Sequence, residues 1–476
     1  MAIEPLWAVA FFRRSSFNFK GSNLSGSAEN QIETPTESRN RFSPAYRNYA
    51  LGILFVGYIV NFVDRSILSL LLEPIKLELF LTDSQLGLLG GLAFALFYTF
   101  LGIPIAALAD RRSRVKILAV SMVIWSAMTA LCGLASNFWM LLMARIGVGV
   151  GEAGASPPSH SLISDYFPIE KRATALSIYA LGIPFGTMIG NYVGGWGADT
   201  IGWRNTFFLV GLPGIFVALV IFFTLREPPR GMSDIRPGQG GANTGAAPRT
   251  DAPQISEVLS LLWAKVSFRH LAFAAGLHAF VSYGAGTWNA PFFIRIHNMS
   301  STDLGAALAL VAGIGAIGTF FGGYVSDKLS DRTGDKRWYF WVPGIATIIM
   351  VPFQLVAYLN NDITSAIASL CVVAIMGSVY LGPSFAMTQA LVSLRMRAVA
   401  SAILLFVLNL IGMGLGPWFV GILSDILMPA MGTESLRYAL CVAVLVNLWA
   451  GIHYLLGARS VRGDLLETEA MNAKLA

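Results

Sequence analysis

The sequence predicts an all-α integral membrane protein, with twelve transmembrane helices in two pseudo-symmetric six-helix bundles. Three observations lead to this fold class. Of the 476 residues, 55% are hydrophobic and only 13% are charged, about half the charged fraction of an ordinary soluble domain. The apolar residues fall into long runs, and the two halves of the chain repeat one another. Water cannot solvate so apolar a chain, so we expect it to lie in a bilayer.

Twelve apolar runs are long enough for a bilayer-spanning helix, which needs about 20 mostly apolar residues. A Gly- and Pro-rich stretch separates the sixth run from the seventh and is expected to be a flexible linker. The expected regions are a disordered N-terminal tail (1–45), an N-terminal bundle (46–225), the linker (226–266), a C-terminal bundle (267–457) and a C-terminal tail (458–476). The runs lie at 49–72, 84–109, 116–136, 138–164, 173–198, 205–225, 268–293, 303–326, 338–359, 363–392, 398–424 and 434–457.

Basic residues are distributed unevenly among the segments between the runs. Of 33 Lys and Arg, 27 fall in the two tails, the linker and the loops that follow even-numbered runs. The loops after odd-numbered runs hold only Lys76, Arg204, Arg295 and Arg437. The positive-inside rule therefore predicts that both termini are cytoplasmic. We expect a plasma membrane, the inner membrane of a bacterium, and interpret the net charge of +6 as contact with anionic lipid rather than nucleic acid.

The halves share a charged loop pattern. "ALADRRSRVK" follows the second run and "YVSDKLSDRTGDKR" follows the eighth, so that Asp110 matches Asp327, 217 positions later. Two related six-helix bundles are a transporter architecture, with the substrate site expected at midplane between them. We expect the loop charges to form breakable ion pairs between the halves in an outward-open state; the alternative is a topology signal alone. The expected cytoplasmic gate residues are Asp110, Arg111, Arg114, Asp327, Lys328 and Arg332.

Four ionisable residues lie inside predicted helices of the N-terminal half: Asp64, Arg65, Arg145 and Glu152. Each costs about 2.5–3.5 kcal/mol at a bilayer centre on insertion scales, so a function is the default interpretation. Asp64 and Arg145 fall at a similar depth and are expected to tether the first helix to the fourth. The fork of Arg65 suits an anion, while Glu152, nearer midplane, is expected to carry a proton, with Asp64 as its competitor. The alternative is a neutral structural clamp.

The C-terminal half contrasts with this charged wall. Away from their ends, its predicted helices contain no Asp, Glu, Lys or Arg. A cavity charged on one wall and apolar on the other suits an anionic amphiphile. Asn61, Tyr283 and Trp288 are expected to line it with Arg65, although aromatic residues on such helices commonly pack instead. His278 is interpreted as a hydrogen-bonded core residue, with a proton relay as the alternative.

Other chemistries find no support in the sequence. No Gly-rich stretch follows a predicted strand, so none is interpreted as a nucleotide loop. The three cysteines, Cys132, Cys371 and Cys441, lie in apolar runs and suggest neither a disulfide nor a metal site. We therefore expect no enzyme activity, no metal and no cofactor other than a proton gradient. The expected partners are an amphiphilic substrate and membrane lipids, and the chain is expected to be a monomer.

Several of these stretches resemble the major facilitator superfamily over nearly the whole chain. The loop "AALADRRSRVK" resembles the family's Gly-x-x-x-Asp-Arg/Lys-x-Gly-Arg pattern, and Arg145, Gly149 and Gly151 match its pattern on the fourth helix. Within the family, "VDRSILSLLLEPIKLELFLTDSQLGLLGG" and "ARIGVGVGEAGASPPSHSLISDYFP" are similar to the Spinster branch. The resemblance implies a secondary transporter that works by alternating access. It also implies an amphiphilic cargo such as a lysolipid or sphingoid phosphate.

Two alternatives remain open at this point. The same carrier architecture can move a small organic anion or a drug. A protein of another class, a lipid scramblase or sensor, can use charged membrane residues without stoichiometric transport.

Overall fold

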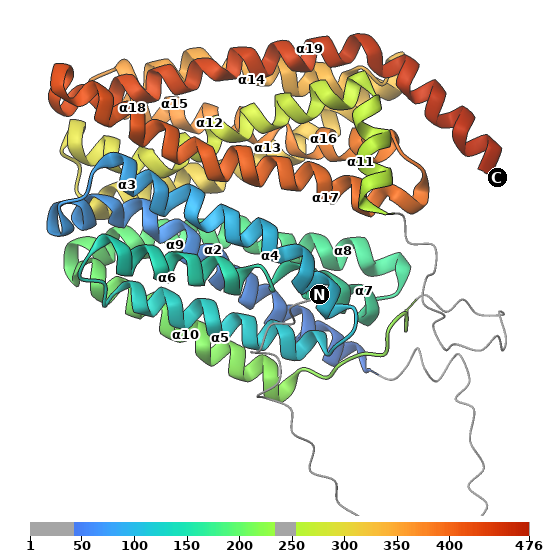
Figure 1. Ribbon diagram of the computed structural model, residues 1–476, viewed down its shortest axis with the longest axis horizontal. Helices are drawn as coiled ribbons and strands as arrows, with labels where there is room; N and C mark the ends of the chain where they lie inside the picture. Colours follow the sequence, from blue (N-terminus) through green and yellow to red (C-terminus); the bar gives the residue numbers. More distant parts are fainter. Residues whose placement is uncertain (1–41, 234–253, 476) are drawn as a thin grey trace, which may run out of the picture.

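The chain folds into two helical bundles that lie side by side (Figure 1). A computed structural model describes residues 42–233 and 254–475, so the tail expected at 1–45 lies almost wholly outside the described residues. The N-terminal bundle consists of α2 (Pro44–Leu79), α3 (Asp83–Gly87), η2 (Leu88–Leu92), α4 (Ala93–Ala109), α5 (Arg114–Cys132), α6 (Phe138–Glu152), α7 (Ser156–Tyr166), α8 (Ile169–Ala180), α9 (Gly182–Thr200) and α10 (Gly202–Thr224).

The C-terminal bundle repeats this plan after a short connecting helix. Its elements are α11 (Ile255–Ala264), α12 (Val266–His297), α13 (Ser301–Thr333), α14 (Trp338–Leu359), α15 (Ile363–Ser378), α16 (Leu381–Ala390), η3 (Leu394–Met396), α17 (Arg397–Val407), η4 (Leu408–Leu415), α18 (Gly416–Met431), η5 (Gly432–Glu434) and α19 (Ser435–Leu475).

Twelve spans follow from the lengths of these helices. Ten helical stretches of the described chain are long and apolar enough to cross a membrane, and the bent pair α11–α12 makes an eleventh. One stretch, Arg397–Ala473, has 77 residues, which at about 1.5 Å per residue is several times the thickness of a hydrocarbon core. It folds back at Gly432–Glu434 into two spans, so that α18 and α19 lie side by side. The fold class predicted from the sequence is confirmed.

The fourth span is broken in its middle. Helix α6 ends at Glu152, and α7 begins at Ser156 with proline in its first turn. Proline is accommodated there because the first turn of a helix has no intrahelical acceptor for its N–H groups. Broken helices at membrane depth are typical of transporters, where they line sites rather than lipid. The carboxyl group of Glu152 therefore lies directly at the break.

Both ends of the expected linker are ordered. Residues 255–264 form α11, which bends by 100° from α12 and buries Val258 and Leu262 against the C-terminal bundle. The expected C-terminal tail is also helical, because α19 runs on to Leu475. Lys265 holds this extension by donating to the Asp464 carbonyl at 3.1 Å. Local apolar spacing and packing thus order segments whose overall composition favours a flexible chain.

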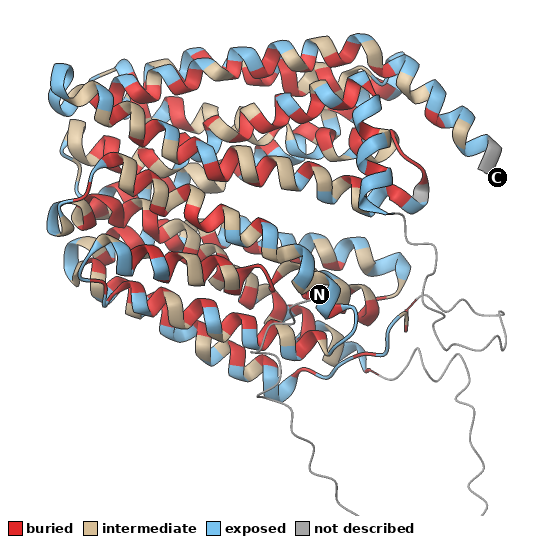
Figure 2. Cartoon of the chain, in the orientation of Figure 1, coloured by how far each residue is buried: buried red, intermediate tan, exposed pale blue. Residues whose placement is uncertain are grey.

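The two halves share an apolar core at one face of the molecule. We call the face with the starts of α2 and α12 and the end of α10 the linker face, and its opposite the outer face. One apolar core at the outer face combines residues of both halves, such as Ile67, Leu71, Trp288 and Leu304. Toward the linker face the apolar clusters are separate and, apart from Met413, each belongs to one half. Figure 2 shows buried residues between helices and exposed ones along the bundle surfaces, where large exposed residues such as Phe216 and Phe223 suit contact with lipid.

Candidate functional site

An ion pair between the first and fourth spans lies at the centre of the N-terminal bundle. The Nε–H of Arg65 donates to Glu152 Oε2 at 2.5 Å. The Glu152 side chain is completely buried, and that of Arg65 is 19% exposed. Helix α2 supplies the arginine, and the break after α6 supplies the carboxylate. Because a buried charge without a partner is costly, each of these two groups stabilises the charged form of the other.

Three aromatic rings surround the guanidinium group of Arg65. Its Cζ atom lies 5.2 Å from the ring centroid of Phe62, 5.0 Å from that of Phe94 and 4.6 Å from that of Tyr98. Such distances allow favourable cation–π contacts. Phe94 also lies 5.4 Å from the Cζ atom of Arg145, so this one ring contacts both guanidinium groups. The arrangement holds Arg65 in place while leaving part of it accessible to a ligand.

The expected tether between Asp64 and Arg145 differs from the pairing found. Asp64 Oδ2 accepts a hydrogen bond from Thr129 at 3.2 Å, and its Oδ1 has no partner in the described chain. Arg145 donates to the carbonyl of Leu89 at 3.5 Å. The direct link between the first and fourth spans is therefore Arg65 with Glu152, because neighbouring residues of a helix point about 100° apart and depth alone does not determine which one faces the partner.

Unpaired polar atoms gather beside this ion pair. Asn61 is buried and lies close enough to Glu152 for a side-chain interaction, although its Nδ2 and the Oε1 of Glu152 form no hydrogen bond of good geometry in the described residues. Asn61 lies one turn before Asp64 and Arg65 on α2. Buried polar groups are normally satisfied by protein or water, so Asn61 adds a polar group to the surroundings of the ion pair.

The C-terminal half contributes one of the two expected aromatic residues. Tyr283 on α12 is 40% exposed and lies close enough to Arg65 for an electrostatic interaction. Trp288 is completely buried, and its Nε1–H donates to the Pro417 carbonyl at 2.8 Å. The expectation that Trp288 lines the substrate site is therefore wrong for this state of the protein. Both residues lie in one apolar helix, and the sequence there does not distinguish a partly exposed aromatic side chain from a buried one.

His278 is a structural residue in this arrangement. Its ring is fully buried, with Nδ1 at 3.0 Å from Thr347 Oγ1 and Nε2 at 2.9 Å from the Gly377 carbonyl. A carbonyl can only accept, so Nε2 carries the proton and Nδ1 accepts from the threonine. Gly377 lies where α15 gives way to α16, so the histidine satisfies a carbonyl at a helix break.

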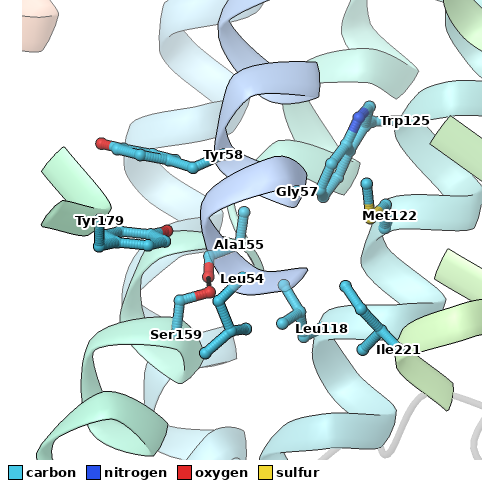
Figure 3. Close-up of a pocket in the computed structure, with 10 residues that line it drawn as sticks. All are labelled: Leu54, Gly57, Tyr58, Leu118, Met122, Trp125, Ala155, Ser159, Tyr179 and Ile221. Carbon is cyan, nitrogen blue, oxygen red and sulfur yellow. Dashed lines mark hydrogen bonds between the residues drawn. The ribbon is translucent and has the colours of Figure 1, made fainter. Parts of the chain in front are cut away.

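A small cavity lies beside the break in the fourth span (Figure 3). It is lined by residues of the first, third, fourth, fifth and sixth spans, mostly apolar, with Ser159 among them. Tyr58 and Tyr179 stack at its edge with ring centroids 4.2 Å apart. The cavity is too small and too apolar to hold an anionic amphiphile.

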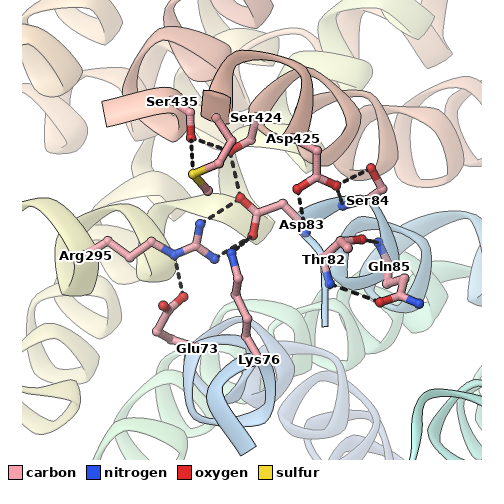
Figure 4. A network of polar contacts seen from close by, with 11 residues as sticks. Glu73, Lys76, Thr82, Asp83, Ser84, Gln85, Arg295, Ser424, Asp425 and Ser435 are labelled. Atoms are coloured by element: carbon pink, nitrogen blue, oxygen red, sulfur yellow. Dashed lines mark hydrogen bonds and ion pairs between the residues drawn. The ribbon is translucent and has the colours of Figure 1, made fainter. Parts of the chain in front are cut away.

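A charged network at the outer face was not expected from the sequence (Figure 4). Arg295 of α12 donates to both Asp83 oxygens, at 2.7 and 2.8 Å, and to Glu73 at 2.6 Å. Lys76 and Ser424 also donate to Asp83, at 2.5 and 2.7 Å. Glu73, Lys76 and Asp83 belong to the N-terminal half, while Arg295 and Ser424 belong to the other. The network therefore fastens the two halves together at this face.

The expected gate residues at the linker face make no ion pair between the halves in the described chain. Asp110 lies 3.9 Å from Arg230, which follows the sixth span of the same half. Asp327 accepts from Tyr339 at 2.5 Å, and Lys328 donates to Tyr324 at 3.0 Å, within the other half. Arg111 and Arg332 are exposed. The predicted pairing belongs to the other state of the protein and remains a prediction.

Arg114 differs from the other expected gate residues because it is buried within its own half. It donates to Glu227 at 2.7 Å and to the Pro228 carbonyl at 2.8 Å, and it forms an ion pair with Asp165. Burial alone would raise the pKa of Glu227, but hydrogen bonds from Val115, Arg114 and the Ser113 hydroxyl outweigh it and hold the pKa below its ordinary value. The first residues after the sixth span are therefore fastened to the N-terminal bundle.

Comparison with known proteins agrees with this architecture. The model of the Major Facilitator Superfamily matches residues 54–417. An MFS-type efflux pump of Mycolicibacterium smegmatis is 30% identical over 439 residues, which are 92% of this chain and 98% of that protein. The chain belongs to the Major Facilitator Superfamily, and it is an integral membrane transporter.

Within that superfamily the chain resembles the Spinster proteins. The crystal structure of a bacterial homolog of the human lysosomal transporter Spinster, inward-facing and unoccupied, superimposes with a TM-score of 0.81 at 35% identity, covering 89% of this chain and 99% of that one. A sphingosine-1-phosphate transporter of Danio rerio is 26% identical over 85% of this chain and 83% of its own. The branch inferred from the sequence is confirmed.

Proposed function

We propose that this protein is a secondary active transporter for an anionic amphiphile, a lysolipid or sphingoid phosphate, coupled to protons. The observation that carries the proposal is the partly accessible Arg65, paired with the buried Glu152 and opposed across the halves by Tyr283. A guanidinium group recognises phosphate through parallel hydrogen bonds, and an aromatic wall without charges suits an acyl chain. The likeness to a sphingosine-1-phosphate transporter supports the same substrate class.

Proton coupling in this proposal follows from competition for Arg65. With the site empty, Glu152 neutralises Arg65 in a buried ion pair. An incoming anionic head group takes over the guanidinium group, which leaves a buried carboxylate without its partner. Binding a proton removes that unfavourable charge. Substrate binding and protonation of Glu152 then favour one another, with Asp64 as the second candidate for the proton.

The proposed state of the structure is inward-open. The outer face is closed by the Arg295–Asp83 network, while the apolar clusters near the linker face are separate. In this proposal the protein lies in a bacterial inner membrane with the linker face and both termini on the cytoplasmic side, an orientation that the Lys and Arg distribution supports. Alternating access then requires the outer contacts to break as the linker face closes, which brings the expected gate residues of the two halves together.

A binding and exchange experiment tests the substrate class. The purified protein is screened for binding of lysolipids, sphingoid phosphates, hexuronates and neutral sugars, and hits are tested for counterflow in proteoliposomes. We expect saturable counterflow of a phosphate-bearing amphiphile, at least tenfold weaker binding by Arg65→Ala, and poor rescue by Arg65→Lys because a point charge loses the forked geometry. Arg459→Ala, at an exposed arginine outside the expected gate, is the control. Full transport by Arg65→Ala would remove this residue from the site.

A second candidate substrate is a small organic anion or drug. The 30% identity to an MFS-type efflux pump favours it, because Arg65 and its aromatic ring cage can also recognise a compact aromatic anion. The screen separates the two, since a drug carrier exchanges the small anions and ignores the lipids. Lipid movement that neither saturates nor shows counterflow would instead indicate a scramblase.

A further inference from the structure

The outer contact between the halves contains one arrangement of residues twice. The second span begins at Asp83 and the eighth span begins at Ser301, both at the outer face. An aspartate of the opposite half lies against the start of each helix: Asp425 of α18 at the second span, and Asp199 of α9 at the eighth. The first N–H groups of a helix have no intrahelical acceptor, so each acid supplies one from across the interface.

In the first copy both oxygens of Asp425 are used. Oδ1 accepts from the Asp83 N–H at 3.0 Å, and Oδ2 accepts from the Ser84 N–H at 2.7 Å and its hydroxyl at 2.5 Å (Figure 4). The helix that it caps, Asp83–Ala109, has 27 residues. The local cap residue Thr82 accepts from the N–H of Gln85 instead. Asp425 of the opposite half therefore accepts from the first two N–H groups of the helix, and the local residue Thr82 accepts from the third.

The second copy repeats this division. Asp199 Oδ2 accepts from the Thr302 N–H at 2.7 Å and from its hydroxyl at 2.8 Å. The local cap residue Ser300 accepts from the Asp303 N–H at 3.1 Å. A carboxylate near a helix N-terminus is further stabilised by the helix dipole. Each helix start thus has these protein acceptors only while the two halves are in contact at the outer face.

Glycines bring the backbones close enough for these caps. One turn before each acid, a Cβ atom on Gly421 would overlap the Asp83 carbonyl, and a Cβ atom on Gly195 would overlap the Ser301 carbonyl. Both carbonyls belong to the opposite half. Any side chain at either glycine would therefore separate the halves at this point.

A second pair of glycines continues each contact one turn into the capped helix. A Cβ atom on Gly87 would lie 2.5 Å from the Pro417 carbonyl oxygen, and one on Gly305 would lie 2.5 Å from that of Asn191. The two contacts thus have the same composition. In each, one helix supplies a glycine and an aspartate, and the helix of the opposite half supplies the capped N-terminus and a second glycine.

The sequence carries the same duplication. Residues 191–199, "NYVGGWGAD", and 417–425, "PWFVGILSD", both have glycine in fifth place and aspartate in ninth. Residues 82–87, "TDSQLG", and 300–305, "SSTDLG", both begin with a hydroxyl cap residue and end with glycine. The pairing is crosswise, the second span with the eleventh and the eighth with the fifth, as expected for repeats related by a pseudo-twofold axis.

We infer that Asp199 and Asp425 are positioning residues that hold the outer face closed through these two cross-half clasps. The clasps are polar and lie at the ends of helices, so water can satisfy the same groups once the halves separate. They therefore bias the equilibrium between inward-open and outward-open states without locking it. This inference rests on the alternating-access part of the proposed function and does not depend on the substrate class.

Spin-label distances in nanodiscs test the inference without substrate. In a background with the three cysteines replaced by serine, one pair of labels is placed at the outer face, on Leu77→Cys and Ile426→Cys, which are 69% and 67% exposed. A second pair, on Ile169→Cys and Ile255→Cys, reports on the linker face. We expect one predominant short outer distance in this background.

Removing the acids should shift this distribution. Asp199→Ala and Asp425→Ala are each expected to raise the outward-open to inward-open ratio about fivefold, the factor that a lost helix cap of ordinary strength represents. The double variant should raise it about 25-fold, because the sites are separate. Asp199→Asn and Asp425→Asn keep an acceptor oxygen and should give smaller shifts.

Two matched controls make the result decisive. Asp362 also caps an outer helix, accepting from the Ser365 N–H at 2.9 Å, but within its own half; Asp362→Ala should leave both distances unchanged. Gly195→Ala should open the outer face, whereas Gly286→Ala, with nothing within 4 Å of the added methyl, should not. Unchanged distances in the Asp199 and Asp425 alanine variants, or an equal shift in Asp362→Ala, would overturn the inference and leave the substrate proposal intact.

Discussion

Replacing Arg114 by methionine should lower the free energy of unfolding, because the arginine holds the start of the linker against the N-terminal bundle. The side chain is 1% exposed and binds Asp165, Glu227, Ser161 and the Pro228 carbonyl. Removing one partner of a buried ion pair costs about 3–5 kcal/mol. The Glu227 side chain is a third exposed, so losing that contact adds only about 1 kcal/mol or less.

The cost of leaving Asp165 without Arg114 is reduced in the variant. Asp165 keeps a hydrogen bond from the Gly231 N–H at 3.0 Å, and methionine fills much of the vacated volume. We therefore expect a loss of about 3 kcal/mol, measured by equilibrium unfolding in mixed micelles. Arg111→Met, at an exposed position of the same loop, should change stability by less than about 0.5 kcal/mol. Equal stabilities of the two variants would refute the reasoning and return Arg114 to the role of a gate residue.

Three further predictions concern other parts of the chain. Because the folded pKa of Glu227 is lowered, its contribution to stability should be present above about pH 4.5 and lost as pH falls through the folded pKa; the melting-temperature gap between wild type and Glu227→Gln should close toward acid, and a constant gap would contradict this. Gly149→Ala puts a methyl group 2.8 Å from the Phe94 carbonyl oxygen and should lower transport and stability, unlike Gly102→Ala, which has open space. Glu152→Gln should lose uptake driven by a pH gradient in proteoliposomes yet keep substrate exchange, and a wild-type response to the gradient would transfer the proton to Asp64.

The sequence predicts the spans and the charged wall because both depend on composition along the chain. A bilayer requires long apolar runs, so each charge inside one stands out, and Arg65 and Glu152 are found in this way. Their pairing depends on helix rotation, which a difference of one residue changes by about 100°. Depth alone therefore favours Asp64 with Arg145, whereas the structure pairs Arg65 with Glu152.

The outer network escapes prediction for a different physical reason. Glu73, Asp83 and Arg295 lie at helix ends, where charges are common and carry no periodic signal. Only the fold brings these three segments together, over sequence separations of up to 222 residues. Trp288 shows the same limit in an apolar setting, since its burial depends on the opposite face of the interface. The doubled glycine and aspartate spacing is the one sequence signal that points to this face.

The charged wall also determines what an electrical measurement on this transporter would report. Asp64 and Glu152 balance Arg65 and Arg145, and no other Asp, Glu, Lys or Arg lies deep in a described span away from its ends. With all four ionised, the sum of these charges is zero, so their combined movement in the membrane field does almost no net work. A single uncompensated charge would contribute about 2.3 kcal/mol per 100 mV. The voltage dependence of transport therefore reports the net charge of the cargo together with its coupled protons. Transport current recorded as a function of the membrane potential then gives their stoichiometry.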